Sequence, residues 1–251
     1  MSAATTIRFD YTETHVLVTG GTAGIGAGIA AAYRDAGAHV TITGTRPRAA
    51  DYGGDAEGYA YLPMRLTENA DIAAVAEALP RLDILVNNAG GNFMTDNEFD
   101  PDVFDRAVRV NLTGAYRLAH ACLPHLSQSA LPGGASVIGL ASMTSYFGNT
   151  YVPGYGAAKG GLVQLTKSLA MAWAAQHVRV NAVAAGLIAS RMTGNFVATP
   201  SMAQPALDRT PLKRFGQPAD IAGAVLFLTS SAASFVTGQT LPVDGGYSIF
   251  G

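Results

Sequence analysis

Short apolar runs rich in β-branched residues alternate along the chain with longer Ala-rich segments. This alternation is typical of βαβ units, in which the strands of a parallel sheet are buried on both faces. Seven runs are predicted strands, at residues 15–19, 39–43, 58–62, 83–86, 135–140, 178–183 and 240–243. We therefore expect an α/β fold with a doubly wound, seven-stranded parallel sheet of the Rossmann type.

Five segments between these runs are predicted helices, at residues 25–36, 69–79, 101–126, 154–176 and 218–229. Two other segments, 45–57 and 190–210, show no clean periodicity and are expected to be irregular. A long irregular segment inside a compact domain is often a lid or a binding loop. Because no repeat or linker divides the sequence, we expect one domain over residues 1–251, with a substrate lid at 187–210.

Composition narrows the functional classes. The chain has 251 residues, of which 49% are hydrophobic and 14% are charged, so it is long and apolar enough for a large core. Its formal net charge is -2, and it therefore lacks the positive surplus that attracts nucleic-acid phosphates. A nucleic-acid partner is disfavoured, and a small-molecule substrate is favoured.

The single cysteine, the first ten residues and one uncharged stretch indicate the cellular compartment that we expect. The single cysteine, Cys122, cannot form a disulfide within the chain, which favours a reducing compartment. The first ten residues include Arg8 and Asp10 and lack the apolar core of a signal peptide. The uncharged stretch 221–243 loses its apolar character after Leu228, so we interpret it as a buried helix, a loop and a strand. A cytoplasmic protein without a membrane span is expected.

A glycine-rich segment follows the first predicted strand and leads into the first predicted helix, with the sequence Thr19-Gly20-Gly21-Thr22-Ala23-Gly24-Ile25-Gly26. Such a loop brings free N–H groups and the positive end of a helix dipole close to a pyrophosphate, although an ordinary turn stays an alternative. The candidate contacts to a dinucleotide are Gly20, Thr22, Ala23, Gly24, Ile25 and Gly26.

Tyr155 and Lys159 are four residues apart, on one face of a predicted helix. A nearby cation favours a phenolate, and this pair could therefore serve as a general acid and base, unless it is a chance surface pair. Ser142 follows the predicted strand 135–140, at the edge of the sheet where open α/β folds bind ligands.

These features together resemble the short-chain dehydrogenase/reductase family, especially its 3-oxoacyl reductases and secondary-alcohol dehydrogenases. The resemblance runs through nearly the whole chain. Asn111 is similar to the catalytic asparagine of that family, and the ending at residues 243–246 is similar to its usual ending. The N-N-A-G element of the family is matched by Asn87-Asn88-Ala89-Gly90. For the asparagines a cap or turn role is the alternative, and for Asn87 and Asn111 it is part of the family role, because these hold a sheet edge and a helix bulge in shape.

The resemblance implies a mechanism. Tyr155 would exchange a proton with a carbonyl or hydroxyl oxygen as a nicotinamide cofactor delivers or accepts a hydride. Lys159 would lower the pKa of Tyr155 and bind the nicotinamide ribose, and Ser142 would hold the substrate oxygen. Asn111 would anchor a water that relays protons. Further cofactor contacts implied by the family are Asn88, Ala89, Gly90, Gly186 and Ile188.

The residues after the second predicted strand favour NADP over NAD. Gly44 stands where NAD-preferring members of the family carry a carboxylate. Thr45, Arg46 and Arg48 offer a hydroxyl and two cations for a 2′-phosphate. Ala23 is a departure, since NADP-preferring members often place a basic residue there, and NAD therefore stays an alternative.

The adenine side carries a second departure. Arg65 stands where the family usually has an aspartate that hydrogen-bonds the adenine. Arg65 and its neighbour Leu66 are candidate cofactor contacts, but Arg65 is equally compatible with a plain surface cation.

Substrate contacts are expected from apolar side chains near the catalytic group. The candidates are Ser142, Met143, Phe147, Val152 and Met192. A packing role is an equal alternative for the apolar ones. The family's usual Pro-Gly after the sixth strand is replaced by Ala185-Gly186, which removes a fixed φ before the expected lid.

Two alternative functions are weighed against a small ketone or secondary alcohol as substrate. A 3-oxoacyl-[acyl-carrier-protein] reductase should present basic residues to its acidic partner, yet residues 118–158 contain no Lys or Arg. A non-catalytic nicotinamide sensor would be expected to have lost Tyr155 or Lys159. In the family, segments such as 101–126 and 154–176 pack into homotetramers, and the low charge of segment 154–176 agrees with this.

Overall fold

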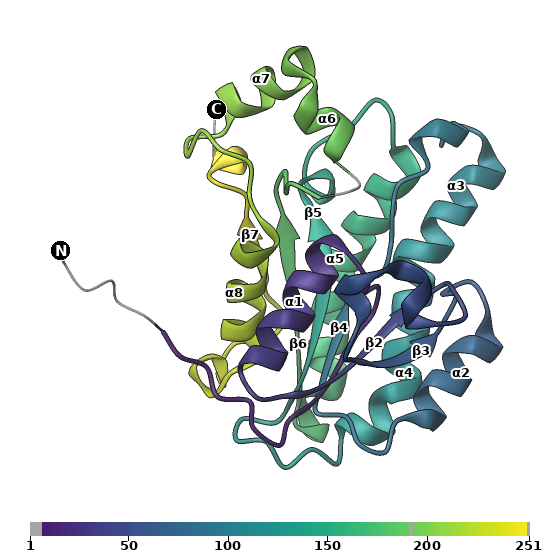
Figure 1. Ribbon diagram of the computed structural model, residues 1–251, viewed down its shortest axis with the longest axis vertical. Coiled ribbons are helices and arrows are strands. Elements are labelled where there is room, and N and C mark those ends of the chain that lie inside the picture. The colour runs from purple at the N-terminus through teal and green to yellow at the C-terminus, as the bar shows by residue number, and fades with distance from the viewer. Residues whose placement is uncertain (1–6, 191–192, 250–251) are drawn as a thin grey trace.

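Seven parallel strands form one sheet in the order β3-β2-β1-β4-β5-β6-β7 (Figure 1). The strands are β1 His15–Val18, β2 His39–Gly44, β3 Ala60–Pro63, β4 Ile84–Asn87, β5 Ala135–Ser142, β6 Val178–Ala185 and β7 Thr240–Val243. The computed structural model describes residues 7–190 and 193–249. All seven predicted strands are confirmed, with ends that differ by at most two residues. The strand order reverses direction between β1 and β4, and ligands of open α/β sheets bind beyond the carboxyl ends at such a point.

Helices cover both faces of the sheet because successive strand residues point to opposite sides. Val16 and Val18 of β1 pack in an apolar cluster with residues of α1 and α8, whereas Leu17 packs with α2, α4 and α5. The helices are α1 Gly24–Asp35, α2 Asn69–Ala78, α3 Pro101–Val108, α4 Gly114–Leu126, α5 Pro153–Trp173 and α8 Pro218–Thr229. The α/β expectation of a doubly wound, single domain is confirmed.

The predicted helix 101–126 is present, with one interruption. A π-helical turn, Arg109–Thr113, joins α3 to α4. Such a turn adds a residue to the helical repeat and frees a backbone carbonyl. The side-chain amide of Asn111 fills this role, since its Nδ2 donates a hydrogen bond to the carbonyl oxygen of Ala107 at 2.9 Å.

The two segments expected to be irregular differ in outcome. Residues 45–57 form no α-helix, and contain only the short 3-10 helices Ala49–Tyr52 and Gly54–Ala56. Residues 190–210 were expected to be irregular, and this is wrong, because the segment contains α6 Gly194–Ala198 and α7 Pro200–Arg209. These helices lie at the top of Figure 1, beyond the strand ends. Because they bury little surface there, with Ala203 the buried position of α7, no apolar period marks them in the sequence.

The uncharged stretch 221–243 divides as expected into a buried helix, a loop and a strand. It begins within α8, passes through the 3-10 turn Ser231–Ala233, and ends with β7. Within residues 7–190 and 193–249, no helix has both the length and the hydropathy that crossing a membrane requires.

Candidate active site

The glycine loop connects β1 to α1 at the sheet edge, and its backbone needs glycine at two kinds of position. Gly20 and Gly24 adopt φ values of +63° and +57°, which side chains disfavour. Gly26 lies against the turn itself, where an added Cβ would clash with the carbonyl oxygen of Gly20 and the amide of Asn88. The spacing of these glycines therefore reflects both a tight turn and a close approach of α1 to that turn.

The N-terminus of α1 has the features of an anion-binding site. Ala23, with an extended backbone, occupies the N-cap position and provides no capping side chain, and the first turn carries no acidic residue. Among the described residues, no hydrogen-bond acceptor is recorded for the N–H groups of Gly24, Ile25 and Gly26. Unpaired N–H groups at the positive end of a helix suit a pyrophosphate, and buried Thr22 lies in the same loop. This part of the chain thus fits a dinucleotide.

Asn88 and Thr19 hold the loop in shape. Asn88 Nδ2 donates hydrogen bonds to the carbonyl oxygens of Thr19 at 2.8 Å and Gly20 at 3.2 Å. The hydroxyl oxygen of Thr19 accepts from the backbone N–H groups of Asn88 at 3.0 Å and Ala89 at 2.9 Å. The sequence pattern suggested Asn88 and Ala89 as cofactor contacts but not the supporting role of Thr19, since this role depends on contact between β1 and the end of β4.

The end of β2 is covered by Tyr52, which sequence reasoning missed. The Tyr52 hydroxyl accepts a hydrogen bond from the Arg46 backbone N–H at 2.7 Å and is 3.2 Å from the Thr45 hydroxyl. The Arg46 guanidinium lies 4.9 Å from the centre of the Tyr52 ring. A Cβ on Gly44 would come within 2.7 Å of the Tyr52 hydroxyl, so a carboxylate at position 44 could enter only if this ring moved.

The two candidate contacts on the adenine side lie differently. Arg65 forms a two-pronged ion pair with Asp71 of α2, with Nε–Oδ2 and Nη2–Oδ1 distances of 2.8 and 3.1 Å. Leu66 is buried in the core cluster beneath the sheet, which leaves its backbone as the part that a ligand can contact.

The carboxyl end of β5 and the first turns of α5 bring Ser142, Tyr155 and Lys159 together. Lys159 is only 4% exposed, and its Nζ donates a hydrogen bond to the Leu140 carbonyl oxygen at 2.6 Å. The same Nζ lies 5.4 Å from the centre of the Tyr155 ring. The Ser142 side chain lies close enough to the Tyr155 phenol to lower its pKa. The three side chains that the sequence singled out therefore do meet.

Burial dominates the electrostatics of this group. It raises the pKa of Tyr155 above its ordinary value of 10.0, while the Ser142 side chain lowers that pKa and the Glu98 charge raises it further. Burial also lowers the pKa of Lys159 from 10.5 to about 8. The net shift of the Tyr155 pKa is thus opposite to the expected lowering by Lys159, because loss of hydration around the phenol outweighs the favourable interactions.

Asn111 contacts the segment that follows β4, at Gly90 and Gly91. Its Oδ1 accepts from the Gly91 N–H at 3.0 Å, and its Nδ2 donates to the Gly91 carbonyl oxygen at 2.8 Å. A Cβ on Gly90 would clash with Asn111 Oδ1 and stand 3.7 Å from Lys159 Nζ. Gly90 therefore separates the Asn111 amide from the Lys159 ammonium.

Glu98 is a further member of the site that the sequence did not reveal. It is fully buried, and its two carboxylate oxygens each accept a 2.7 Å hydrogen bond, from the backbone N–H groups of Phe93 and Tyr155. Nothing in the local sequence distinguishes Glu98 from surface acids nearby, and its partner Tyr155 is 57 residues away.

The expected substrate residues are only partly exposed. Met143 and Val152 are buried, and Met143 packs in a small cluster with Ala141, Ala182 and Ala184. The Phe147 ring packs edge-on against Tyr247, and the Arg209 guanidinium of α7 lies 5.0 Å from its centre. The expected contact Met192 lies outside the described residues.

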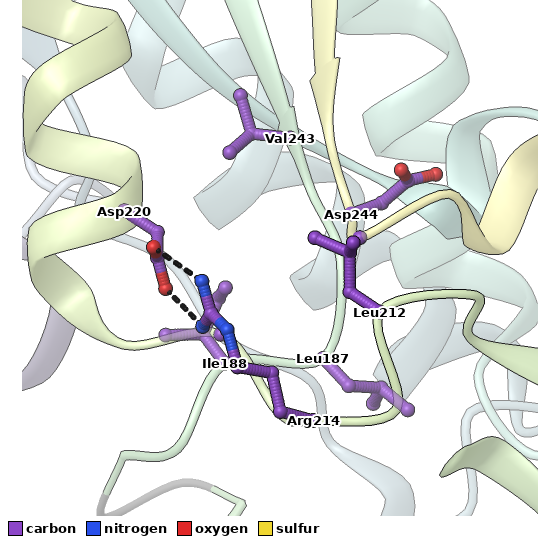
Figure 2. Close-up of a pocket in the computed structure, with 9 residues that line it drawn as sticks. Leu187, Ile188, Leu212, Arg214, Asp220, Val243 and Asp244 are labelled. Carbon is purple, nitrogen blue, oxygen red and sulfur yellow. Dashed lines mark hydrogen bonds and ion pairs between the residues drawn. The ribbon is translucent and has the colours of Figure 1, made fainter.

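A small cavity marks the base of the expected lid (Figure 2). It measures about 110 Å³ and is lined by residues that follow β6 and β7, including Ile188, and by an ion pair between Arg214 and Asp220. Sites for small molecules usually measure about 300–1,000 Å³, so this cavity is smaller than a usual small-molecule site. Gly186 lies beside it, where a Cβ would come within 2.6 Å of the Asp244 Cα.

Comparisons with known proteins agree with this geometry. The family model described as Enoyl-(Acyl carrier protein) reductase matches residues 20–248. Galactitol 2-dehydrogenase (L-tagatose-forming) of Cereibacter sphaeroides is 36% identical over 243 residues, which cover 93% of this chain and 94% of that protein. The 3-oxoacyl-[acyl-carrier-protein] reductase FabG of Aquifex aeolicus is 35% identical over 247 residues, covering 92% and 95% of the two chains.

A solved structure shows the same similarity in three dimensions. Gluconate 5-dehydrogenase from Burkholderia cenocepacia, in complex with NADP and tartrate, has a TM-score of 0.86 and 31% sequence identity, over 96% of this chain and 98% of that one. The family match spans the glycine loop and the segment that carries Tyr155 and Lys159. The chain therefore belongs to the short-chain dehydrogenase/reductase family and is an NAD(P)-dependent oxidoreductase acting on CH–OH and C=O groups.

Proposed function

We propose that the protein interconverts a ketone and a secondary alcohol, with NADP as its preferred cofactor and Tyr155 as the general acid and base. The observation that carries this proposal is the meeting of Ser142, Tyr155 and Lys159 at one end of β5, beside a helix N-terminus prepared for a pyrophosphate. Bound NADPH would supply the hydride in reduction, and bound NADP⁺ would accept it in oxidation.

The side chains of the protein bind the substrate oxygen and transfer its proton. In reduction, the Tyr155 phenol donates its proton to the carbonyl oxygen that becomes the hydroxyl, and in oxidation the phenolate takes that proton back. The Ser142 hydroxyl donates a hydrogen bond to the same oxygen, where negative charge develops. Lys159, with a pKa of about 8, exchanges protons close to neutral pH. Asn111, across Gly90 from Lys159, holds the relay water.

The cofactor preference is proposed from the end of β2. Arg46 donates to the Asp51 carbonyl oxygen and keeps its guanidinium over the Tyr52 ring, and this cation suits a 2′-phosphate. Tyr52 occupies the space that a ribose-binding carboxylate at position 44 would need. The other proposed cofactor contacts are Gly20, Thr22, Ala23, Gly24, Ile25, Gly26, Thr45, Arg65, Leu66, Asn88, Ala89, Gly90, Lys159, Gly186 and Ile188.

The proposed substrate is small and largely apolar, and residues 187–210 serve as its lid. Met143, Phe147 and Val152 supply apolar surface beside Ser142, and α6 and α7 lie beyond the strand ends. Reduction of a substrate on acyl-carrier protein is the second candidate, supported by the similarity to FabG. It is less favoured because residues 118–158 carry no Lys or Arg for an acidic partner. The buried Cys122, whose pKa burial raises to about 12, suits a reducing cytoplasm.

The test is a coenzyme assay on a panel of compounds. The panel contains cyclohexanone, ethyl acetoacetate, a 3-oxosteroid, galactitol and gluconate, each with NADP(H) and NAD(H) at equal concentration. We expect turnover with NADP(H), and a loss of about 100-fold or more in Tyr155→Phe with NADPH affinity retained. Tyr151→Phe, on an exposed ring nearby, is the control.

Each contrary result has a distinct meaning. Near wild-type turnover in Tyr155→Phe would overturn the assignment of the general acid. A clear preference for NAD would overturn the interpretation of residues 44–46. Tight NADPH binding without turnover of any compound would favour the nicotinamide sensor.

A further inference from the structure

Glu98 is a buried carboxylate that the proposed mechanism does not yet use. Its side chain is inaccessible to solvent, and none of the ion pairs recorded among the described residues includes it. A buried carboxylate is costly unless hydrogen bonds compensate for lost hydration. Here the compensation comes from two backbone N–H groups, those of Phe93 and Tyr155, each at 2.7 Å.

The hydrogen bond from the Tyr155 N–H to Glu98 caps helix α5 with a side chain from a distant part of the chain. Helix N-termini leave their first N–H groups without partners, and α5 has Val152 at the N-cap position with no side-chain cap. Pro153 brings no N–H, and Tyr155 is the third residue of the helix. The carboxylate of Glu98 satisfies the Tyr155 N–H and also lies favourably at the positive end of the helix dipole. Gly154 allows the close packing of this turn on α3, since a Cβ there would stand 3.1 Å from the Phe104 Cα.

The bond to Phe93 reaches the segment that follows β4. Asn111 holds the start of this segment through both backbone groups of Gly91. The Phe93 ring is covered by the Arg106 guanidinium, at 4.2 Å from its centre, and Arg106 also pairs with Asp96. One carboxylate therefore links a segment beside the reacting group to the helical turn that carries the phenol.

We propose that Glu98 is a positioning residue for the oxidoreductase reaction, which fixes the Tyr155 phenol relative to the segment 91–97 through a two-pronged cap on α5. This inference rests on the proposed role of Tyr155. It predicts effects on catalysis through geometry and through charge, and these effects can be separated by substitution.

The charge effect is specific to Glu98. Its negative charge raises the pKa of Tyr155, while Lys159 on the same helix places its ammonium 5.4 Å from the centre of the Tyr155 ring. Ser142 of β5 contributes only a hydroxyl, and the 3-10 turn Met143–Ser145 that packs on α5 carries no charge. The charged residues of α3, which also packs on α5, are exposed to water: Asp102, Asp105 and Arg106.

Glu98→Gln is the decisive variant, because it removes the charge while keeping the shape. A glutamine offers one acceptor oxygen, so one of the two N–H groups loses its partner. We expect kcat for the fastest compound of the panel to fall about tenfold or more, because a small misplacement of the acid is costly. NADPH affinity should stay within twofold of wild type. Asp105→Asn, an equal change of charge on the exposed side of α3, should leave kcat unchanged.

The second readout is the ionisation of Tyr155, followed by nuclear magnetic resonance of the tyrosine Cζ carbon with Tyr155→Phe as the assignment control. The pKa of Tyr155 should fall by about half a unit or more in Glu98→Gln, because a neighbouring negative charge is lost. General loosening would admit water to the phenol and lower the same pKa, but it would do so in Glu98→Asp as well as in Glu98→Gln. Glu98→Asp keeps the charge but is too short to reach both N–H groups, so it should keep the pKa and lose kcat.

Two results would overturn the proposal. One is a wild-type kcat together with a wild-type Tyr155 pKa in Glu98→Gln; the other is an equal pKa change in Asp105→Asn. If Glu98→Gln does not fold, Glu98→Asp decides, and wild-type kcat in that variant overturns the two-pronged cap. Failure of the proposed function is distinguishable, since it would appear as turnover in Tyr155→Phe whatever Glu98 does.

Discussion

Lys159 combines a place in the proposed active site with a cost in stability. It is buried at 4% exposure, its ammonium has one recorded hydrogen bond, to Leu140, and its pKa is lowered to about 8. In the unfolded chain the pKa of Lys159 would be near 10.5. Between about pH 8 and pH 10.5, folding therefore releases a proton from this residue. Below pH 8 the folded protein bears the whole cost of a buried cation, and above pH 10.5 it bears none.

Replacement of Lys159 by methionine should therefore change stability in a pH-dependent way. The free energy of unfolding of Lys159→Met minus that of the wild type should be about 3 kcal/mol higher at pH 7 than at pH 10.5, because only the wild type bears the cost of the buried cation at pH 7. Urea unfolding of both proteins across this range measures the gap, and Lys167→Met, at an exposed site on α5, controls for the loss of one lysine. A gap that is constant with pH would contradict the lowered pKa of Lys159.

At the scale of elements, the glycine loop and α1 form one unit whose geometry depends on the absence of side chains. Gly20 and Gly24 need their positive φ values, and Gly26 needs the space that Gly20 and Asn88 fill. The sequence predicted this loop well because its determinants are neighbours in the chain. Tyr52 at the end of β2 was not predicted, because its contact with Gly44 depends on how the irregular segment 45–57 folds back.

Gly26→Ala should separate packing at the loop from helix propensity. The added methyl group clashes with the Gly20 carbonyl, so we expect NADPH affinity to fall about tenfold or more. Gly223→Ala in α8 is the matched control, since a Cβ there meets no atom within 4 Å, and it should stabilise the protein by up to about 1 kcal/mol. Fluorescence titration with NADPH and urea unfolding measure the two effects. Unchanged NADPH affinity in Gly26→Ala would contradict the role given to this loop.

At the scale of the whole molecule, two sets among the exposed large apolar side chains bear on assembly. Tyr116 of α4 and Met171 of α5 form one set, on helices that cover the same face of the sheet. The other set lies at the β7 end of the sheet. It consists of Phe227 in α8, Phe235 in the connection to β7, and Leu241 in β7. Exposed apolar surface of this kind marks protein contacts, and two distinct self-complementary contacts generate a tetramer. The homotetramer expected from the resemblance stays a prediction.

Light scattering should give the mass of four chains for the wild-type protein. Met171→Asp and Phe235→Asp each place a charge in one of the two sets, and each should yield dimers, because a buried charge without a partner is costly. Ser168→Asp, at a polar exposed site on α5, should leave the tetramer intact. A monomeric wild-type protein would contradict the tetramer.

The sequence by itself predicted the succession of strands and most helices along the chain, the glycine loop, and Ser142, Tyr155 and Lys159 as candidate site residues, because these depend on spacing between near neighbours. The tertiary structure decided the rest. It formed α6 and α7 in a segment without an apolar period, placed Tyr52 over Gly44, and brought Glu98 to the start of α5. It also reversed the expected pKa shift of Tyr155. These features arise from contacts between distant residues and from burial, which local spacing does not encode.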